Sequence, residues 1–177
     1  MSQGLCTALV DATEDAVNLI LETLATVIAQ DKRTSLADVE AVVAPMILKI
    51  WAENFNDPLL QSDVSDILDV LIDRPECLPS LCNRAFPTLG TIISNPSQQP
   101  NGLVEAALDI ATVLLKRSTP ETAALAYGTL YDPIIRLAVE NDDHGILQSS
   151  AESLRAFVRA AGSGVLNIEG KSKSHTY

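Results

Sequence analysis

The sequence has few aromatic and few basic residues, and each shortage excludes a class of partner. Aromatic residues make up only 4%, which leaves few rings on which nucleic-acid bases could stack. The 12 Lys and Arg residues are outnumbered by 23 Asp and Glu residues, and the formal net charge is −11. Neutralising nucleic-acid phosphates requires clustered basic residues. We therefore expect no nucleic-acid partner, whereas a basic protein is favoured.

Long apolar runs are also absent, and cysteine is rare. The longest apolar stretch, 103–115, is interrupted by Glu105 and Asp109, whereas a membrane span needs roughly 18 to 20 apolar residues. The N-terminus has no basic segment typical of a secretory signal. The chain has only three cysteines, an odd number that cannot all pair in disulfides, which indicates a reducing compartment. We expect no membrane insertion and a cytoplasmic and nuclear location.

The sequence repeats itself with a period of about 43 residues. Three apolar helical segments each contain one proline, namely Pro45, Pro87 and Pro133, at spacings of 42 and 46. An interior proline removes a backbone donor and bends a helix. Its recurrence at matching places therefore indicates a bend that packing uses.

A second series of apolar segments lies between the first and carries a recurring acidic residue. The acidic positions are Glu22, Asp66, Asp109 and Glu152, at spacings of 44, 43 and 43. Apolar residues flank them at helical intervals. Two markers thus give one period, which favours a repeat over chance.

The two series together predict paired helices. The first helices of the pairs cover about 35–54, 78–94 and 120–140, and the second helices cover 14–30, 58–73, 102–117 and 144–161. Period, pairing and bent first helices resemble HEAT repeats. We therefore expect an all-α, right-handed α-solenoid of about three and a half HEAT-type (armadillo-like) helix pairs over 1–162, with a flexible polar tail at 163–177.

The second helices carry the candidate binding residues, because in curved helix-pair solenoids they usually line the concave face. Polar residues form stripes there, and such stripes are also typical of the solvated side of any amphipathic helix. Four aspartates on 58–73 come without a single Lys or Arg, and like charges at this spacing repel. A basic ligand would relieve that repulsion. The predicted partner-binding residues are Glu22, Asp63, Asp66, Asp69, Asp73, Asp109 and Glu152.

The charge of the chain is concentrated in its first part. Residues 1–73 carry 13 acidic and 3 basic residues, whereas residues 74–177 carry 10 and 9. The acidity is therefore no general coat for solubility. Its density on 58–73 favours a docking surface for basic protein.

No motif indicates catalysis, a metal or a cofactor. Gly170-Lys171-Ser172 lacks the glycine spacing and the preceding strand of a P-loop. Cys77 and Cys82 have no second cysteine pair or nearby histidine to complete a zinc site. We therefore expect no enzyme, no catalytic residue, no metal and no cofactor.

Four segments resemble karyopherins of the importin-beta family in the same order along the chain. They are Asn56-Asp57-Pro58, FPTLGTII (86–93), GLVEAALDIATVLLKRSTP (102–120) and NDDHGILQSSAESLRAFVRAA (141–161). The resemblance covers roughly residues 14–160 and lies in the middle-to-late repeats of the family.

The resemblance implies a segment of a nuclear import receptor that carries basic protein cargo, of histone or ribosomal-protein type, in Ran-dependent transport. The amino-terminal repeats that contact the small GTPase Ran in this family are absent. We therefore expect a piece of a longer array that does not itself contact Ran. The alternative is a HEAT-repeat scaffold subunit of a complex unrelated to transport.

Overall fold

The computed structural model describes residues 14–30 and 36–165, and every regular element in these ranges is helical. The all-α prediction is confirmed. The chain forms two compact units, Met1–Ala85 and Phe86–Tyr177, and the boundary falls within helix α5 (Leu78–Ser94). Each unit is described separately below.

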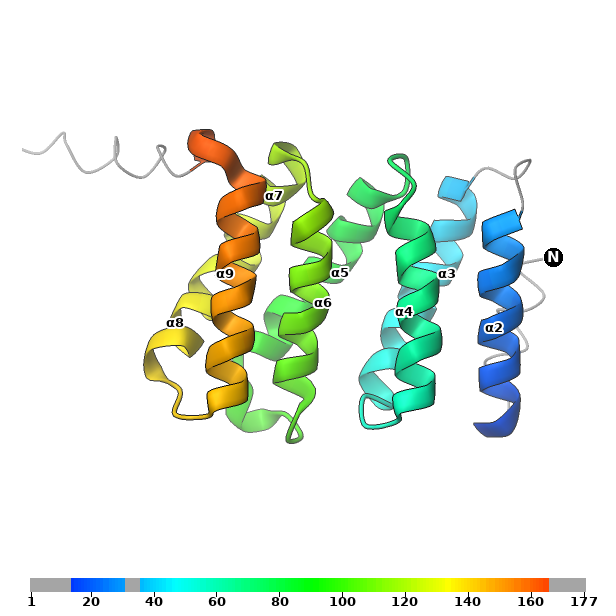
Figure 1. Ribbon diagram of the computed structural model, residues 1–177, viewed down its shortest axis with the longest axis horizontal. Coiled ribbons are helices and arrows are strands. Elements are labelled where there is room, and N and C mark those ends of the chain that lie inside the picture. Colours follow the sequence, from blue (N-terminus) through cyan, green and yellow to red (C-terminus); the bar gives the residue numbers. More distant parts are fainter. Residues whose placement is uncertain (1–13, 31–35, 166–177) are drawn as a thin grey trace, which may run out of the picture. The chain divides into compact units, whose positions relative to one another are not determined.

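The first unit contains α2 (Glu14–Gln30), α3 (Leu36–Glu53), α4 (Pro58–Ile72) and the beginning of α5. The helix α4 packs side by side with α2 and also contacts α3 (Figure 1). Apolar residues at helical spacing fill the space between these helices, because each helix is apolar on one side only. The largest fully buried side chains here are Leu21, Leu24, Ile28, Ile47, Trp51, Ile67, Leu71 and Leu81.

A partly buried ion pair joins two helices of the first unit that are one repeat apart. The Glu40 side chain on α3 is buried, and its Oε1 accepts a hydrogen bond from Nε of Arg84 on α5 at 3.2 Å. The two residues are 44 positions apart in the sequence. The pair therefore ties successive first helices together at the repeat spacing.

The second unit contains the end of α5, a 3-10 turn (Pro96–Gln98), α6 (Leu103–Arg117), α7 (Pro120–Ala126), a π-helical turn (Tyr127–Tyr131), α8 (Asp132–Glu140) and α9 (His144–Val165). The helices α6 and α9 pack side by side, and α7 and α8 pack against α9 (Figure 1). Buried large side chains of this unit include Phe86, Leu89, Ile93, Leu108, Leu114, Leu130, Ile134 and Phe157.

Polar contacts between α6 and α9 also recur near the repeat period. The hydroxyls of Thr112 and Ser153 lie 2.7 Å apart in a buried hydrogen bond, and Ser153 donates to the carbonyl of Leu108 at 3.1 Å. These partners are 41 and 45 residues apart in sequence. Small hydroxyl side chains let the two helices approach closely, and the buried hydroxyls of Thr112 and Ser153 both have a hydrogen-bond partner.

Most predicted helix boundaries agree with the structure to within a residue or two. The last helix is an exception, because α9 continues through Gly162 and Gly164 to Val165 instead of ending at about 161. The predicted tail, 163–177, lies mostly outside the described residues. The helix pairs are consistent with an α-solenoid, and its right-handed course through all repeats stays a prediction.

The third proline-containing segment differs from the expected bent helix. Pro45 and Pro87 lie inside α3 and α5, but Pro133 follows the π-helical turn that separates α7 from α8. Proline cannot donate a hydrogen bond to the carbonyl four residues earlier, and its ring crowds that carbonyl. For Pro133 this carbonyl belongs to Thr129, within the π-helical turn. The π-helical turn has a wider hydrogen-bond pattern than an α-helix, and it lies directly before the helix that contains Pro133.

The carbonyl of Thr129 also explains a glycine on α5. A Cβ atom added to Gly90 would lie 2.8 Å from this carbonyl oxygen, which is backbone and cannot turn away. Gly90 is thus required for close packing of α5 against the π-helical turn. At Gly128, by contrast, a side chain has room, since an added Cβ there meets nothing within 4 Å.

We predict that Gly90→Ala lowers the free energy of unfolding by about 1–3 kcal/mol, because the methyl group forces the two segments apart. Gly128→Ala is the matched control and leaves stability unchanged or raises it by up to about 1 kcal/mol, since alanine favours helix. Urea unfolding followed by circular dichroism measures both. Equal stability of the two variants would contradict the close approach at Gly90.

Candidate protein-binding surface

Five of the seven predicted binding residues lie in the first unit, on the two helices that pack side by side. We call this group the acidic face, and it consists of Glu22 on α2, of Asp63, Asp66 and Asp69 on α4, and of Asp73 at the C-cap of α4. Asp63 is half-buried and the other four side chains are exposed. The apolar residues between them in the sequence, such as Val64 and Ile67, point into the core. Core packing therefore holds the carboxylates on the solvent side of α4.

Asp63 is the electrostatically strained residue of the acidic face. Burial raises the pKa of Asp63, and the negative charges of Asp66, Glu22 and Asp57 raise it further. Glu22 comes from a different helix, 41 residues earlier in the sequence. Packing of α2 against α4 thus brings this carboxylate close enough to act on Asp63. Such mutual repulsion is typical of a surface that a cation can stabilise.

Among the described residues, no ion pair with a basic side chain neutralises the centre of this face. In the first unit Lys49 pairs with Glu53 at 3.8 Å and Arg84 pairs with Glu40 at 3.2 Å. Neither pair includes Asp63, Asp66 or Asp69, although these aspartates are within reach of solvent. The central carboxylates are therefore open to a basic partner.

Asp57 belongs to the same acidic run in the sequence but has a different task. Its Oδ1 accepts hydrogen bonds from the amides of Leu59 and Leu60, at 2.9 and 3.2 Å, and so caps the start of α4. A carboxylate at this position also favours the positive end of the helix. Asp57 therefore stabilises the helix that carries the acidic face.

The remaining two predicted residues, Asp109 and Glu152, come together in the second unit. The Oδ1 of Asp109 on α6 accepts a hydrogen bond from the Ser149 hydroxyl at 3.1 Å, and Glu152 on α9 accepts one from Gln148 at 3.2 Å. Burial raises the pKa of Asp109, and Glu152 adds to this, while the Ser149 hydrogen bond and Lys116 act in the opposite direction. Asp109 and Glu152 thus form a second acidic group, and each accepts a hydrogen bond from a neighbouring side chain.

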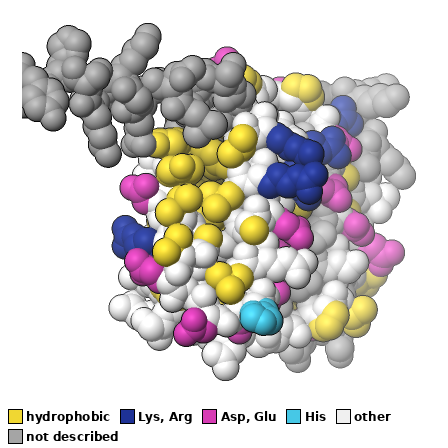
Figure 2. Space-filling model, turned by 60° about the vertical axis from the view of Figure 1, so that its left-hand side comes forward, with side chains coloured by type: hydrophobic (Ala, Val, Ile, Leu, Met, Phe, Trp, Pro, Cys, Tyr) yellow, Lys and Arg dark blue, Asp and Glu magenta, His cyan; other side chains and the backbone are white. Residues whose placement is uncertain are grey.

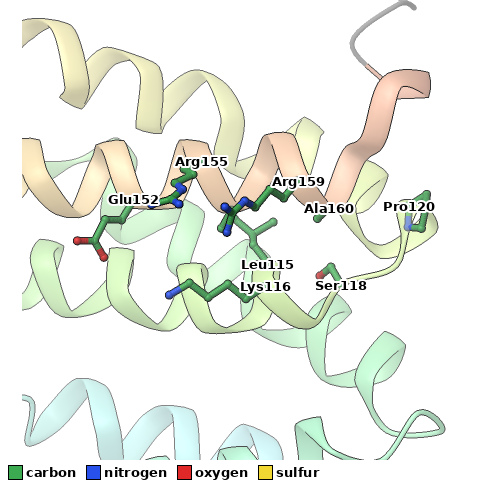
Figure 3. A pocket seen from close by; sticks show the side chains of 9 residues that line it. Leu115, Lys116, Ser118, Pro120, Glu152, Arg155, Arg159 and Ala160 are labelled. Carbon is green, nitrogen blue, oxygen red and sulfur yellow. The ribbon is translucent and has the colours of Figure 1, made fainter.

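The second unit also contains a cavity that the sequence did not indicate. It is open to solvent on one side, has a volume of about 670 Å³ and lies where α6, α9 and the start of α7 meet. Three basic side chains line it, Lys116, Arg155 and Arg159, together with Glu152 at its edge (Figure 3). In Figure 2 a group of Lys and Arg side chains lies on the surface beside an apolar area. The four charged residues come from two separate helices, Lys116 from α6 and the other three from α9. They come together because α6 packs against α9. The pattern of residues within either helix alone does not predict this packing.

The described residues offer neither a metal site nor a membrane span. No group of three or more His, Cys, Asp or Glu side chains among them is arranged to hold a metal ion. Across the same residues, no helix is both long and apolar enough to cross a membrane. Cys77 and Cys82 are buried, and burial raises the pKa of the Cys77 thiol.

Comparison with known proteins finds a distant relative among the importins. Importin-9 of Drosophila melanogaster is 25% identical over 155 residues, which are 87% of this chain. The similarity supports a distant relationship to importins and their helical repeats. The chain spans 15% of the length of Importin-9. No protein-family model matches the sequence.

The strain at Asp63 leads to a prediction for stability. Because the pKa of Asp63 is higher in the folded chain, its ionised form destabilises the fold at neutral pH, and this penalty fades as the pH falls through the folded pKa toward 3.8. We expect Asp63→Asn to raise the unfolding temperature at pH 7 by about 1 °C, since each like-charge pair costs a few tenths of a kcal/mol.

Differential scanning calorimetry at pH 7 and below pH 4 measures the effect. The exposed loop variant Asp142→Asn serves as a control of equal charge change and is expected to leave the unfolding temperature unchanged. A gain for Asp63→Asn that persists at the lower pH would show that the charge of Asp63 is not its cause.

Proposed function

We propose that this chain is a segment of a nuclear import receptor of the importin-beta family that binds basic protein cargo through the acidic face. The proposal covers cargo of histone or ribosomal-protein type, held without covalent chemistry and without catalysis. Shuttling between cytoplasm and nucleus, and dependence on the GTPase Ran, would be properties of a longer receptor that contains this segment.

The observation that carries the proposal is the strained and unneutralised charge on α4. Asp66, Glu22 and Asp57 repel the Asp63 carboxylate, and Asp63, Asp66 and Asp69 lie outside the ion pairs of their unit. Lys and Arg side chains of a partner would replace that repulsion with attraction. Charge complementarity of this kind accelerates encounter and selects basic partners over acidic ones.

The packing of the first unit supports the use of this face for binding. Asp57 caps α4, and buried Leu60, Val64 and Ile67 fix the helix against its neighbours. The carboxylates are thus presented from a rigid element, so that a partner does not have to order the helix when it binds. The distant similarity to Importin-9 agrees with a transport receptor and supports the choice over a general scaffold.

We predict that the triple variant Asp63→Asn, Asp66→Asn and Asp69→Asn binds a purified core-histone dimer about tenfold to a hundredfold more weakly than the unmodified chain. The estimate allows about 0.5–1 kcal/mol for each carboxylate that meets a cation at a partly exposed interface. Fluorescence anisotropy with a labelled histone dimer at 50 mM salt measures the change in Kd.

A matched control removes three carboxylates from the second unit, by Asp132→Asn, Glu140→Gln and Asp142→Asn. It changes the net charge by the same amount and is expected to bind within about threefold of the unmodified chain, because long-range charge alone is screened. The affinity of the unmodified chain should also fall between 50 and 300 mM salt. Equal losses for both triple variants, or binding that salt does not weaken, would contradict cargo binding at the acidic face and favour a scaffold.

A further inference from the structure

The cavity in the second unit brings together three cations from two helices. Lys116 lies in the last turn of α6, and Arg155 and Arg159 follow one another by one turn on α9. Figure 3 shows the two arginine side chains leaving α9 and the lysine leaving α6 on the same side of the helix pair. A cation in the last turn of a helix favours the negative end of its dipole, which accounts for Lys116. The arginines lie in the interior of α9 and have no such role.

None of the three cations forms a close ion pair within the described part of the chain. Neither ion pair found among these residues involves Lys116, Arg155 or Arg159. Glu152 lies at the edge of the cavity and accepts a hydrogen bond from Gln148. Glu152 and Asp109 oppose the three cations, and Lys116 acts on Asp109, so that a local excess of one positive charge remains. Asp109 is the next carboxylate along α6, and Ser149 already donates to it.

The other lining residues of the cavity are mainly apolar, with Ser118 adding a hydroxyl, and they indicate a ligand larger than a bare ion. Leu115 and Pro120 line one part, and Ala156 and Ala160 on α9 line another. The volume of about 670 Å³ falls within the range of sites that hold organic ligands. The site thus combines a compact cationic centre with apolar walls for neighbouring groups.

We infer that this cavity binds a phosphate monoester on a peptide segment of a partner protein, that is, a phosphorylated serine or threonine with apolar neighbours. A phosphate monoester carries about −1.5 to −2 charges at neutral pH and is therefore attracted by the local excess of positive charge. Arginine binds phosphate through paired N–H donors, and two arginines one turn apart can share its oxygens. The apolar walls accept the side chains that flank the phosphorylated residue.

A polynucleotide fits these observations less well than a peptide. Glu152 at the edge would repel neighbouring phosphates of a strand, and the chain carries a net charge of −11. Stacking platforms for bases are also absent from the cavity lining, which contains no aromatic residue. The site is independent of the acidic face, so that either proposal can fail alone.

The test uses the full 177-residue chain with 15N-labelled arginine side chains. The probes are two blocked tripeptides, acetyl-Leu-phosphoserine-Leu-methylamide and acetyl-Gly-phosphoserine-Gly-methylamide, with inorganic phosphate for comparison. Titration should shift the Nε–Hε resonances of Arg155 and Arg159 and leave that of Arg136 in place. The leucine peptide is expected to bind about threefold more tightly than the glycine peptide, since its flanks bury apolar surface.

Single variants establish where the probe binds. Arg155→Gln should weaken binding of the leucine phosphopeptide about tenfold, because a charge-assisted contact is lost. Arg136→Gln makes the same charge change on α8 and should alter binding less than twofold. Circular dichroism of both variants verifies that the fold is kept.

Three results would overturn the inference. Equal losses for Arg155→Gln and Arg136→Gln would indicate attraction by general charge. Binding of inorganic phosphate as tight as that of either phosphopeptide would indicate a site for the free ion. Tighter binding of a single-stranded oligonucleotide, competing for the same arginine resonances, would indicate a nucleic-acid site.

Discussion

The helices of this chain are apolar on one side only, and each must bury that side against a helix one repeat along the sequence. In the first unit α4 covers α2, and in the second unit α9 covers α6. The Glu40–Arg84 pair and the Thr112–Ser153 hydrogen bond join elements across 44 and 41 residues. A helix pair alone would leave its apolar surface in water. This stacking constraint fixes the period, the helix pairs and the places where side chains can meet a partner.

The same constraint distributes charge over the surface. Because the apolar sides face the neighbouring helix, acidic residues that recur with the period are brought together on successive second helices. Glu22 acts on Asp63 across α2 and α4, and Glu152 acts on Asp109 across α6 and α9. The outcome differs between the units. In the second unit Ser149 and Lys116 offset the repulsion at Asp109, whereas the first unit offers Asp63 no such group among the causes of its pKa shift. The acidic face is therefore the part best suited to a basic ligand.

Local signals explain how much of the fold the sequence predicted. The Asp57-Pro58 and Thr119-Pro120 corners start α4 and α7 where expected, because a capping side chain followed by proline favours only a helix start. The helical spacing of apolar residues predicted the buried sides, such as Leu21, Leu24 and Ile28 of α2. These features depend only on residues a few positions apart, so they can be predicted from a single sequence.

Features that depend on contacts across a repeat were not predicted. The π-helical turn before Pro133 and the approach of Gly90 to Thr129 follow from how α5 packs on the segment after α7. The cationic cavity likewise needs α9 beside α6 at the correct rotation. The sequence predicted the acidic residues of α4 and the more distant acidic residues as one binding set. It did not predict that Asp109 and Glu152 belong to a different unit from the acidic face. A periodic pattern predicts that helices stack, and it does not specify which side chains then converge.

The most direct test of binding at the acidic face is zero-length carbodiimide cross-linking of the chain to a core-histone dimer, followed by mass spectrometry. This chemistry joins a carboxylate to a lysine that already contacts it. The account predicts cross-links from Asp63, Asp66 and Asp69 to histone lysines, lost when the reaction is run at 300 mM salt. Cross-links confined to carboxylates of residues 86–165, such as Glu105 and Glu140, would contradict it.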